Sequence, residues 1–181
     1  HIGLVGANGE GKSTFMSVIT RQMQPDAGKI AWAKRVKVGY LDQHAVLEAG
    51  LSIGDVLRSA FAPLFALEQR MNVICEEMGN GSLAEDQLDA AMEELGEIQE
   101  QLLAHDFYLI DSQVEEIASA FSLSDLGLDK DVAMLSGGQR AKLLLAKLLL
   151  EKPEVLLLDE PTNYLDEPHI EWLKRYLQEY E

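Results

Sequence analysis

The sequence predicts an α/β fold that carries an inserted antiparallel helical hairpin, and three observations lead to this prediction. A strand-length apolar run at 2–5 is followed by a glycine-rich loop and a helical segment, the order in which an α/β domain begins. Two apolar stripes with helical spacing lie between residues 63 and 105. A second strand-length apolar run, 155–158, ends in two acidic residues.

Size and composition limit the class of protein. The 181 residues, 47% of them hydrophobic, suffice for one domain with its own core and exclude a disordered chain. No apolar run approaches the ~20 residues that span a bilayer, so we expect no stable membrane insertion. The single cysteine cannot form an internal disulfide, which fits a cytoplasmic location. Because the chain opens inside an apolar run, we expect it to be part of a longer protein.

The net charge of −16 is concentrated in one stretch. Residues 71–129 contain 15 Asp and Glu and no Lys or Arg, whereas the rest of the chain has 15 basic and 16 acidic residues. A solvated helical surface explains such a stretch most simply, but its charge also repels phosphate backbones within a Debye length of about 8 Å. A partner that touches this stretch should therefore present a basic protein surface rather than bare nucleic acid.

Apolar runs, helical periodicity and turn residues predict the elements before residue 63. They are a strand at 2–5, a helix at 12–21, and strands at 29–32 and 36–41. Ser52 and Asp55 are placed as the start of a further helix. That helix should stop before Pro63, because proline cannot continue an interior helical turn.

Residues 63–105 predict two helices that pack against each other in opposite directions. The first stripe comprises Leu64, Leu67, Met71, Ile74 and Met78, and the second comprises Leu88, Ala91, Leu95, Ile98 and Leu102. Both stripes step by three and four residues, and residues 79–82 offer a turn between them. Helices of roughly 16 and 23 residues are about 24 and 34 Å long, so the hairpin can protrude from a compact body.

Three helices and a strand are predicted after the hairpin. Ser112 and Glu115 can form a capping box that opens a helix to about residue 121. A long helix follows Ser136 and ends near residue 151. The run 155–158 is a strand, and an amphipathic helix covers 167–180.

The segment from residue 6 to residue 13, G-A-N-G-E-G-K-S, fits the phosphate-binding pattern G-x-x-x-x-G-K-[ST] between a strand and a helix. The N–H groups of such a loop surround a di- or triphosphate, and the helix N-terminus adds partial positive charge. Lys12 is expected to bind the β- and γ-phosphates, and the Ser13 hydroxyl to ligate Mg²⁺. The alternative is a glycine turn that only needs positive φ. The predicted nucleotide-binding residues are Asn8, Gly9, Glu10, Gly11, Lys12, Ser13 and Thr14.

Asp159 and Glu160 follow directly on the apolar run 155–158. An unpaired buried carboxylate costs several kcal/mol, so a nearby cation is the simpler explanation for acids at this place. We expect Asp159 to hold Mg²⁺ and Glu160 to polarise an attacking water as general base. The alternative is that the two acids only cap the following turn.

The tetrapeptide from Ser136 to Gln139, S-G-G-Q, can form a capping box at the start of the long helix. The Ser136 hydroxyl would accept from the Gln139 N–H, while the Gln139 side chain reaches back. The same helix N-terminus, which has glycine at its first two positions, can also present N–H groups to a γ-phosphate.

Taken in order, these segments resemble the motifs of ATP-binding cassette (ABC) proteins. The phosphate loop resembles Walker A, Gln43 the Q-loop, Leu135–Gln139 the signature, Val155–Glu160 Walker B, and Asn163–Asp166 the D-loop. The resemblance covers nearly the whole chain and implies a P-loop NTPase core of ABC type with a helical subdomain, and ATP and Mg²⁺ as cofactors. It also implies a second ABC cassette as partner, in the same parent chain or as a second copy of this chain. Each ATP then lies between Walker A of one cassette and the signature of the other.

The resemblance also implies roles for single residues. Gln43 would sense Mg²⁺ and the attacking water, so it joins Lys12 and Glu160 as a predicted catalytic residue, and Ser13 and Asp159 as a metal ligand. Ser136, Gly137, Gly138 and Gln139 would contact the partner's ATP, and Asp166 would support the facing domain. An adenine-stacking residue and a switch histidine are expected outside the chain. The isolated chain should therefore bind nucleotide weakly and turn over poorly.

The hairpin before the signature and the segment 161–166 resemble the ABC-F subfamily, whose first cassette carries an arm at this place. Tyr164 replaces a histidine that is common there. The resemblance implies a cytoplasmic ATPase that acts on the ribosome, as a translation factor or in ribosome protection. The alternative is the ATP-binding subunit of an ABC membrane transporter. The predicted segments are a first core part (1–62), the arm (63–105), a helical subdomain with the signature helix (106–151) and a second core part (152–181).

Overall fold

The computed structural model describes residues 2–7, 9–34, 36–41, 47–81 and 84–180. Its helices and strands follow one another as α1 (Lys12–Ile19), β1 (Val38–Tyr40), α2 (Ile53–Arg58), α3 (Ala62–Gly79), α4 (Glu85–Ala104), α5 (Ile110–Ala120), α6 (Gly137–Leu150), β2 (Val155–Leu157) and α7 (Glu167–Gln178). Short 3-10 turns precede α3, α5 and α6 and follow α5. Within the described ranges, no helix is both long and apolar enough to span a bilayer.

Strands β1 and β2 pair in parallel, with Val38 opposite Val155 and Tyr40 opposite Leu157. The ladder continues into Leu41, whose N–H donates to the carbonyl of Leu157 over 3.2 Å. Gly39 lets β1 approach its neighbours, because a Cβ there would lie 2.5 Å from Pro153 and 2.6 Å from Leu148. The two strands therefore lie side by side and run in the same direction.

The expected strands at 2–5 and 29–32 are wrong: the structure assigns no strand to either segment. Ile2 and Val5 are almost fully exposed, at 101% and 94%. A strand is stable only when it pairs and its apolar side chains are covered. In the described part of the chain, β1 and β2 pair only with each other, so apolar composition alone was not enough.

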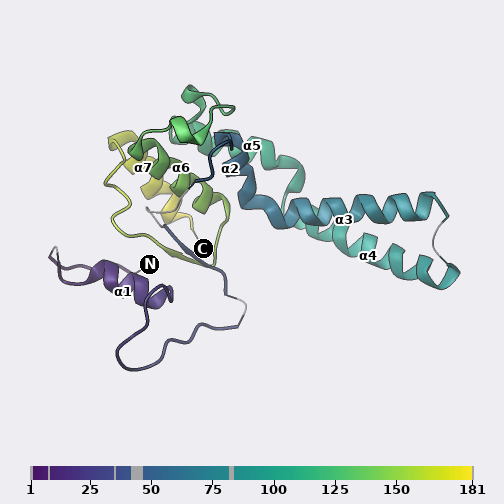
Figure 1. Cartoon of the computed structure of the whole chain (residues 1–181), viewed down its shortest axis with the longest axis horizontal. Helices are drawn as coiled ribbons and strands as arrows, with labels where there is room; N and C mark the ends of the chain where they lie inside the picture. The colour runs from purple at the N-terminus through teal and green to yellow at the C-terminus, as the bar shows by residue number, and fades with distance from the viewer. Residues whose placement is uncertain (1, 8, 35, 42–46, 82–83, 181) are drawn as a thin grey trace.

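The core of the main body lies between α2, α5 and α6. Fully buried side chains from these helices and the turn after α5 include Leu57, Val114, Phe121, Leu143 and Leu149. Helix α7 joins this body through Leu173, and the Tyr176 hydroxyl donates to the carbonyl of Leu149 over 2.9 Å. Figure 1 shows α1 set apart from these helices.

Two helix starts that the sequence predicts are confirmed, and a third is wrong. Ser52 forms a capping box with Asp55, and Ser136 forms one with Gln139. The box expected from Ser112 is absent, because α5 begins at Ile110 without a side-chain cap. A 3-10 turn, Phe107–Leu109, leads directly into α5, and its buried Phe107 packs edge-on against Phe65 with ring centroids 5.5 Å apart.

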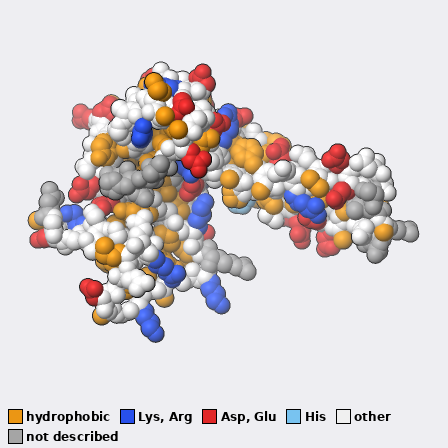
Figure 2. All heavy atoms as spheres, in the orientation of Figure 1, with side chains coloured by type: hydrophobic (Ala, Val, Ile, Leu, Met, Phe, Trp, Pro, Cys, Tyr) orange, Lys and Arg blue, Asp and Glu red, His pale blue; other side chains and the backbone are white. Residues whose placement is uncertain are grey.

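Helices α3 and α4 form the predicted antiparallel hairpin, which projects from the body (Figure 1). Ile74, Ile98 and Leu102 are buried in the seam between the two helices. Arg70 on α3 and Glu94 on α4 make two parallel hydrogen bonds of 2.7 Å, which raise the pKa of the guanidinium and lower the pKa of the carboxyl. Acidic side chains lie along the hairpin in Figure 2. The division of the chain into four segments stays a prediction.

Candidate functional site

The glycine loop adopts a conformation that requires glycine at two positions. Gly9 and Gly11 have φ values of 87° and 88°, in the left-handed region that other residues rarely occupy. Gly11 is the N-cap of α1, and its carbonyl accepts the N–H of Phe15 over 2.8 Å. The loop therefore runs straight into the N-terminus of a helix, which is the arrangement that binds phosphate groups.

The side chain of Lys12 folds back over this loop. Its ammonium donates to the carbonyls of Gly6 and Ala7, over 2.9 and 3.1 Å. A carboxylate oxygen of Glu10 accepts the N–H of Ala7 over 2.8 Å. The Ala7 N–H thus already binds an anionic oxygen, that of Glu10, and the Lys12 ammonium lies over the same loop. These donors are of the kind that binds a phosphate group. Ser13 and Thr14 lie exposed in the first turn of α1, and Asn8 lies outside the described residues.

The second group of predicted residues follows β2. Asp159 is half-buried, and Glu160 is exposed with a φ of 44°, an uncommon value for a residue other than glycine. The side-chain amide of Asn163 donates to a carboxylate oxygen of Glu160 over 2.8 Å, and the Asn163 N–H donates to the Glu160 carbonyl over 3.2 Å. Two hydrogen bonds from one residue therefore fix both the turn and the direction of the Glu160 carboxylate.

The parallel register places the ends of β1 and β2 next to each other. The Leu41 N–H donates to the carbonyl of Leu157, so both strands end at the same edge of the sheet. Gln43 itself lies outside the described residues.

No cluster of three or more metal-binding side chains exists in the described ranges. A Mg²⁺ site does not need one, because Mg²⁺ usually keeps several waters and takes one or two carboxylates together with substrate phosphates. Asp159 and Ser13 carry oxygen atoms of this kind, and their role as Mg²⁺ ligands stays a prediction. The Lys12 ammonium, the predicted phosphate ligand, donates its two hydrogen bonds to backbone carbonyls of its own loop.

The S-G-G-Q segment forms an open helix N-terminus. The Gln139 N–H donates to the Ser136 hydroxyl over 3.3 Å, and the Ser136 N–H donates to the Gln139 side-chain oxygen over 3.0 Å. A Cβ added at Gly137 or Gly138 would meet nothing within 4 Å, so both glycines leave the backbone accessible from outside. Leu135, just before the cap, is buried and anchors the segment. This end of α6 can therefore present N–H groups to a phosphate on another molecule or domain.

The carboxylate of Asp166 is held by two cationic or polar side chains of its own domain. The Lys142 ammonium on α6 donates to it over 3.1 Å, and His169 Nδ1 is in hydrogen-bond contact with the same oxygen. These two hydrogen bonds lower the pKa of the carboxyl from 3.8 to about 2. The sequence analysis does not predict these roles for Lys142, His169 or Asn163. A lysine, histidine or amide side chain can pair with a carboxylate at many sequence spacings, so no pattern points to these three residues.

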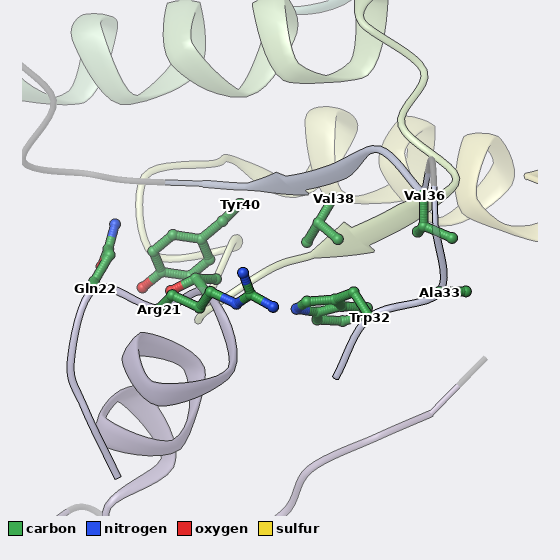
Figure 3. A pocket seen from close by; sticks show the side chains of 8 residues that line it. Arg21, Gln22, Trp32, Ala33, Val36, Val38 and Tyr40 are labelled. Carbon is green, nitrogen blue, oxygen red and sulfur yellow. The ribbon is translucent and has the colours of Figure 1, made fainter. Parts of the chain in front are cut away.

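A cavity of about 530 Å³ lies at the opposite end of α1 from the glycine loop. Its walls are Thr20, Arg21, Gln22, Trp32, Ala33, Val36, Val38 and Tyr40, and most of these side chains point into it in Figure 3. The eight residues of α1 separate the cavity from the loop by about 12 Å. The cavity is therefore not the phosphate site.

Comparison with known proteins places these motifs in one family. The family model described as "ABC transporter" matches residues 1–163. The chain is 66% identical, over its full length, to the "Uncharacterized ABC transporter ATP-binding protein YfmM" of Bacillus subtilis, of which it covers 35%. It is 34% identical over 180 residues to the "Energy-dependent translational throttle protein EttA" of Escherichia coli K12, covering 99% of this chain and 32% of that protein.

A solved structure has the same fold. The structure entitled "Structure of ATP binding subunit of ABC transporter" matches with a TM-score of 0.60 at 22% identity, over 97% of this chain and 61% of that one. This likeness confirms the predicted α/β fold of P-loop NTPase type. The chain spans about a third of the length of its curated relatives. From the family match and these relatives, the chain belongs to the ABC transporter family of ATP-binding domains.

Proposed function

We propose that this chain is the ATP-binding and ATP-hydrolysing cassette of a longer, cytoplasmic ABC-F type protein that acts on the ribosome. The observation that carries the proposal is the acidic hairpin α3–α4, inserted before the signature segment of an otherwise compact ABC domain. The relative EttA, whose name describes a translational throttle, aligns with 99% of the chain, hairpin included.

The hydrolytic chemistry follows from the two groups of residues described above. The loop N–H groups and Lys12 bind the β- and γ-phosphates, and Glu160 takes a proton from the attacking water. When bound through Asp159, Ser13 and Gln43, Mg²⁺ neutralises charge on the phosphates. Asn163 fixes the Glu160 carboxylate, so the base does not have to be ordered at the moment of reaction.

A second cassette completes each site in this proposal. The open N-terminus of α6, with Ser136, Gly137 and Gly138, faces outward and supplies donors for the partner's ATP. The two cassettes then switch between an open and a closed state. ATP drives closure, and hydrolysis returns the pair to the open state. Closure changes the grip of the hairpin on the ribosome, either in a translation factor or in ribosome protection.

The hairpin is suited to a basic protein surface. Its acids are exposed along α3 and α4, among them Glu76, Glu93, Glu97 and Glu100. Apart from the ion pair of Arg70 with Glu94, little positive charge offsets them. We therefore expect the hairpin to meet a basic ribosomal protein or the tRNA-exit region, whereas bare RNA would be repelled.

A second candidate is the ATP-binding subunit of a membrane transporter, the class that the name of the Bacillus subtilis relative describes. ATP hydrolysis by the full-length parent, with and without purified ribosomes, separates the two. Stimulation by ribosomes, lost in the Glu160→Gln parent, is the expected result. A rate that ribosomes leave unchanged would contradict the ribosomal proposal.

A further inference from the structure

His169 is the buried polar residue in the core of the described chain, at 6% exposure. It lies in the first turn of α7 and its ring stacks on Phe121 with centroids 6.0 Å apart and an angle of 7° between the planes. Its Nε2 is 3.3 Å from the Ser122 hydroxyl, in the turn after α5. A buried imidazole fixed on three sides has little freedom to turn.

The other ring nitrogen faces a carboxylate and an ammonium. Nδ1 contacts Asp166, and the Lys142 ammonium lies 3.3 Å from Nδ1 and 3.1 Å from the Asp166 carboxylate. The network is satisfied when Nδ1 carries a proton and donates to Asp166, Lys142 donates to the same oxygen, and the Ser122 hydroxyl donates to Nε2. Lys142 is 17% exposed and Asp166 is 63% exposed, so the carboxylate is held from the protein side and open on the other.

These contacts join two functional segments of one chain. Asp166 ends the turn that begins with Glu160, and Lys142 lies in the second turn of α6, whose first residues form the signature segment. The resemblance assigns Glu160 to the ATP of this cassette and Ser136 to the ATP of its partner. The network is therefore a direct polar link between two segments whose other residues, Glu160 and Ser136, are assigned to different ATP molecules.

We infer that Lys142 and His169 are positioning residues that clamp the Asp166 carboxylate to α6, so that the Glu160–Asp166 turn and the signature end of α6 move as one unit. This inference rests on the proposed ATP hydrolysis. Neither residue touches nucleotide. Their effect is to keep Glu160 at the position set by the signature helix, which alters the rate of hydrolysis rather than the binding of ATP.

The test uses the full-length parent and the variants Lys142→Met, Asp166→Asn and their combination. Each single change should lower kcat about tenfold or more, because a hydrogen bond to a charged group is lost, with KM for ATP and the melting temperature nearly unchanged. The double variant should be no slower than the slower single variant, since both remove the same contact. Lys142→Arg should restore most of kcat.

The matched control is Lys147→Met on the same helix, whose ammonium pairs only loosely with Glu151 at 3.8 Å. It should leave kcat unchanged. His169→Asn tests the histidine arm while keeping a donor near the Nδ1 position, and His169→Leu removes it. His169→Leu should lower kcat more than His169→Asn in preparations matched for folded protein.

Each outcome decides the matter. Wild-type kcat in both Lys142→Met and Asp166→Asn, or additive losses in the double variant, would overturn the inference while leaving the proposed ATPase intact. A wild-type parent that does not hydrolyse ATP would refute the proposed function, and this inference with it.

Discussion

The side-chain amide of Asn163 donates a hydrogen bond of 2.8 Å to the carboxylate of Glu160, three residues earlier in the chain. Glu160 itself has a positive φ, which costs backbone energy for a residue with a Cβ. The turn therefore holds the Glu160 carboxylate in one direction despite the cost of this backbone conformation. The role of Glu160 as a general base stays a prediction, and the following variant tests it.

The first prediction concerns this base. Glu160→Gln keeps the shape of the side chain and its contact with Asn163 but cannot take a proton. Hydrolysis by the parent should slow by roughly 10² to 10⁴, the usual contribution of a positioned general base, while ATP binding is retained. Turnover and nucleotide affinity are measured together, with the exposed Glu116→Gln as control. Unchanged turnover in Glu160→Gln would remove Glu160 from the mechanism.

The second prediction compares two capping boxes of the same geometry. Ser52→Ala and Ser136→Ala each delete the hydroxyl that caps a helix, so each should lower the free energy of unfolding by about 1 kcal/mol. Only Ser136→Ala should also reduce ATP turnover by the parent, roughly tenfold, because only that helix N-terminus is proposed to contact the partner's phosphate. Equal turnover in the two variants would mean that Ser136 is a helix cap and nothing more.

The third prediction is a dependence of stability on pH. Because the pKa of Asp166 is lowered from 3.8 to about 2, its ionised form stabilises the fold above pH 4, and this contribution is lost as the pH falls toward 2. Urea unfolding of the 181-residue chain and of its Asp166→Asn variant should differ at neutral pH, and the difference should shrink as the pH falls through about 2. Asp125→Asn, on an exposed turn, is the control. A difference that does not shrink between neutral pH and pH 2 would show that the charge of Asp166 is not its source.

The fourth prediction concerns the hairpin. Leu102, at its base, belongs to the hydrophobic core, and the partly buried Phe65 packs against that core. A deletion would therefore disturb the body, and charge substitution is the cleaner change. Replacing Glu76, Glu93, Glu97 and Glu100 by Gln should weaken ribosome binding roughly tenfold and leave basal ATP turnover unchanged. The same number of changes outside the hairpin, at Glu115, Glu116, Asp125 and Glu179, is the control. Equal weakening by both sets would point to net charge rather than to the hairpin.

The sequence predicted the local features of this fold well. The stripes at Ile74, Ile98 and Leu102 became the seam of the hairpin, and the pairs Ser52–Asp55 and Ser136–Gln139 became capping boxes. The two residues of each capping box lie within one helical turn, and the members of each apolar stripe recur within one or two turns of the same helix, so local spacing predicts both features.

The features that the sequence did not predict depend on distant parts of the chain. Residues 2–5 have the composition of a strand, but a strand also needs a neighbour, which composition cannot show. The start of α5 was misplaced because Phe107 packs against Phe65, more than 40 residues earlier. Lys142 and His169 were missed for the same reason: they meet across 27 residues.

The ribosomal function can be tested by co-sedimentation of the full-length Glu160→Gln parent with purified ribosomes, with and without ATP, at near-physiological salt. The variant should hold ATP without hydrolysing it, so we expect it to pellet with ribosomes only when ATP is present. Absence from the ribosome pellet in both conditions would contradict the ribosomal function and favour a membrane transporter.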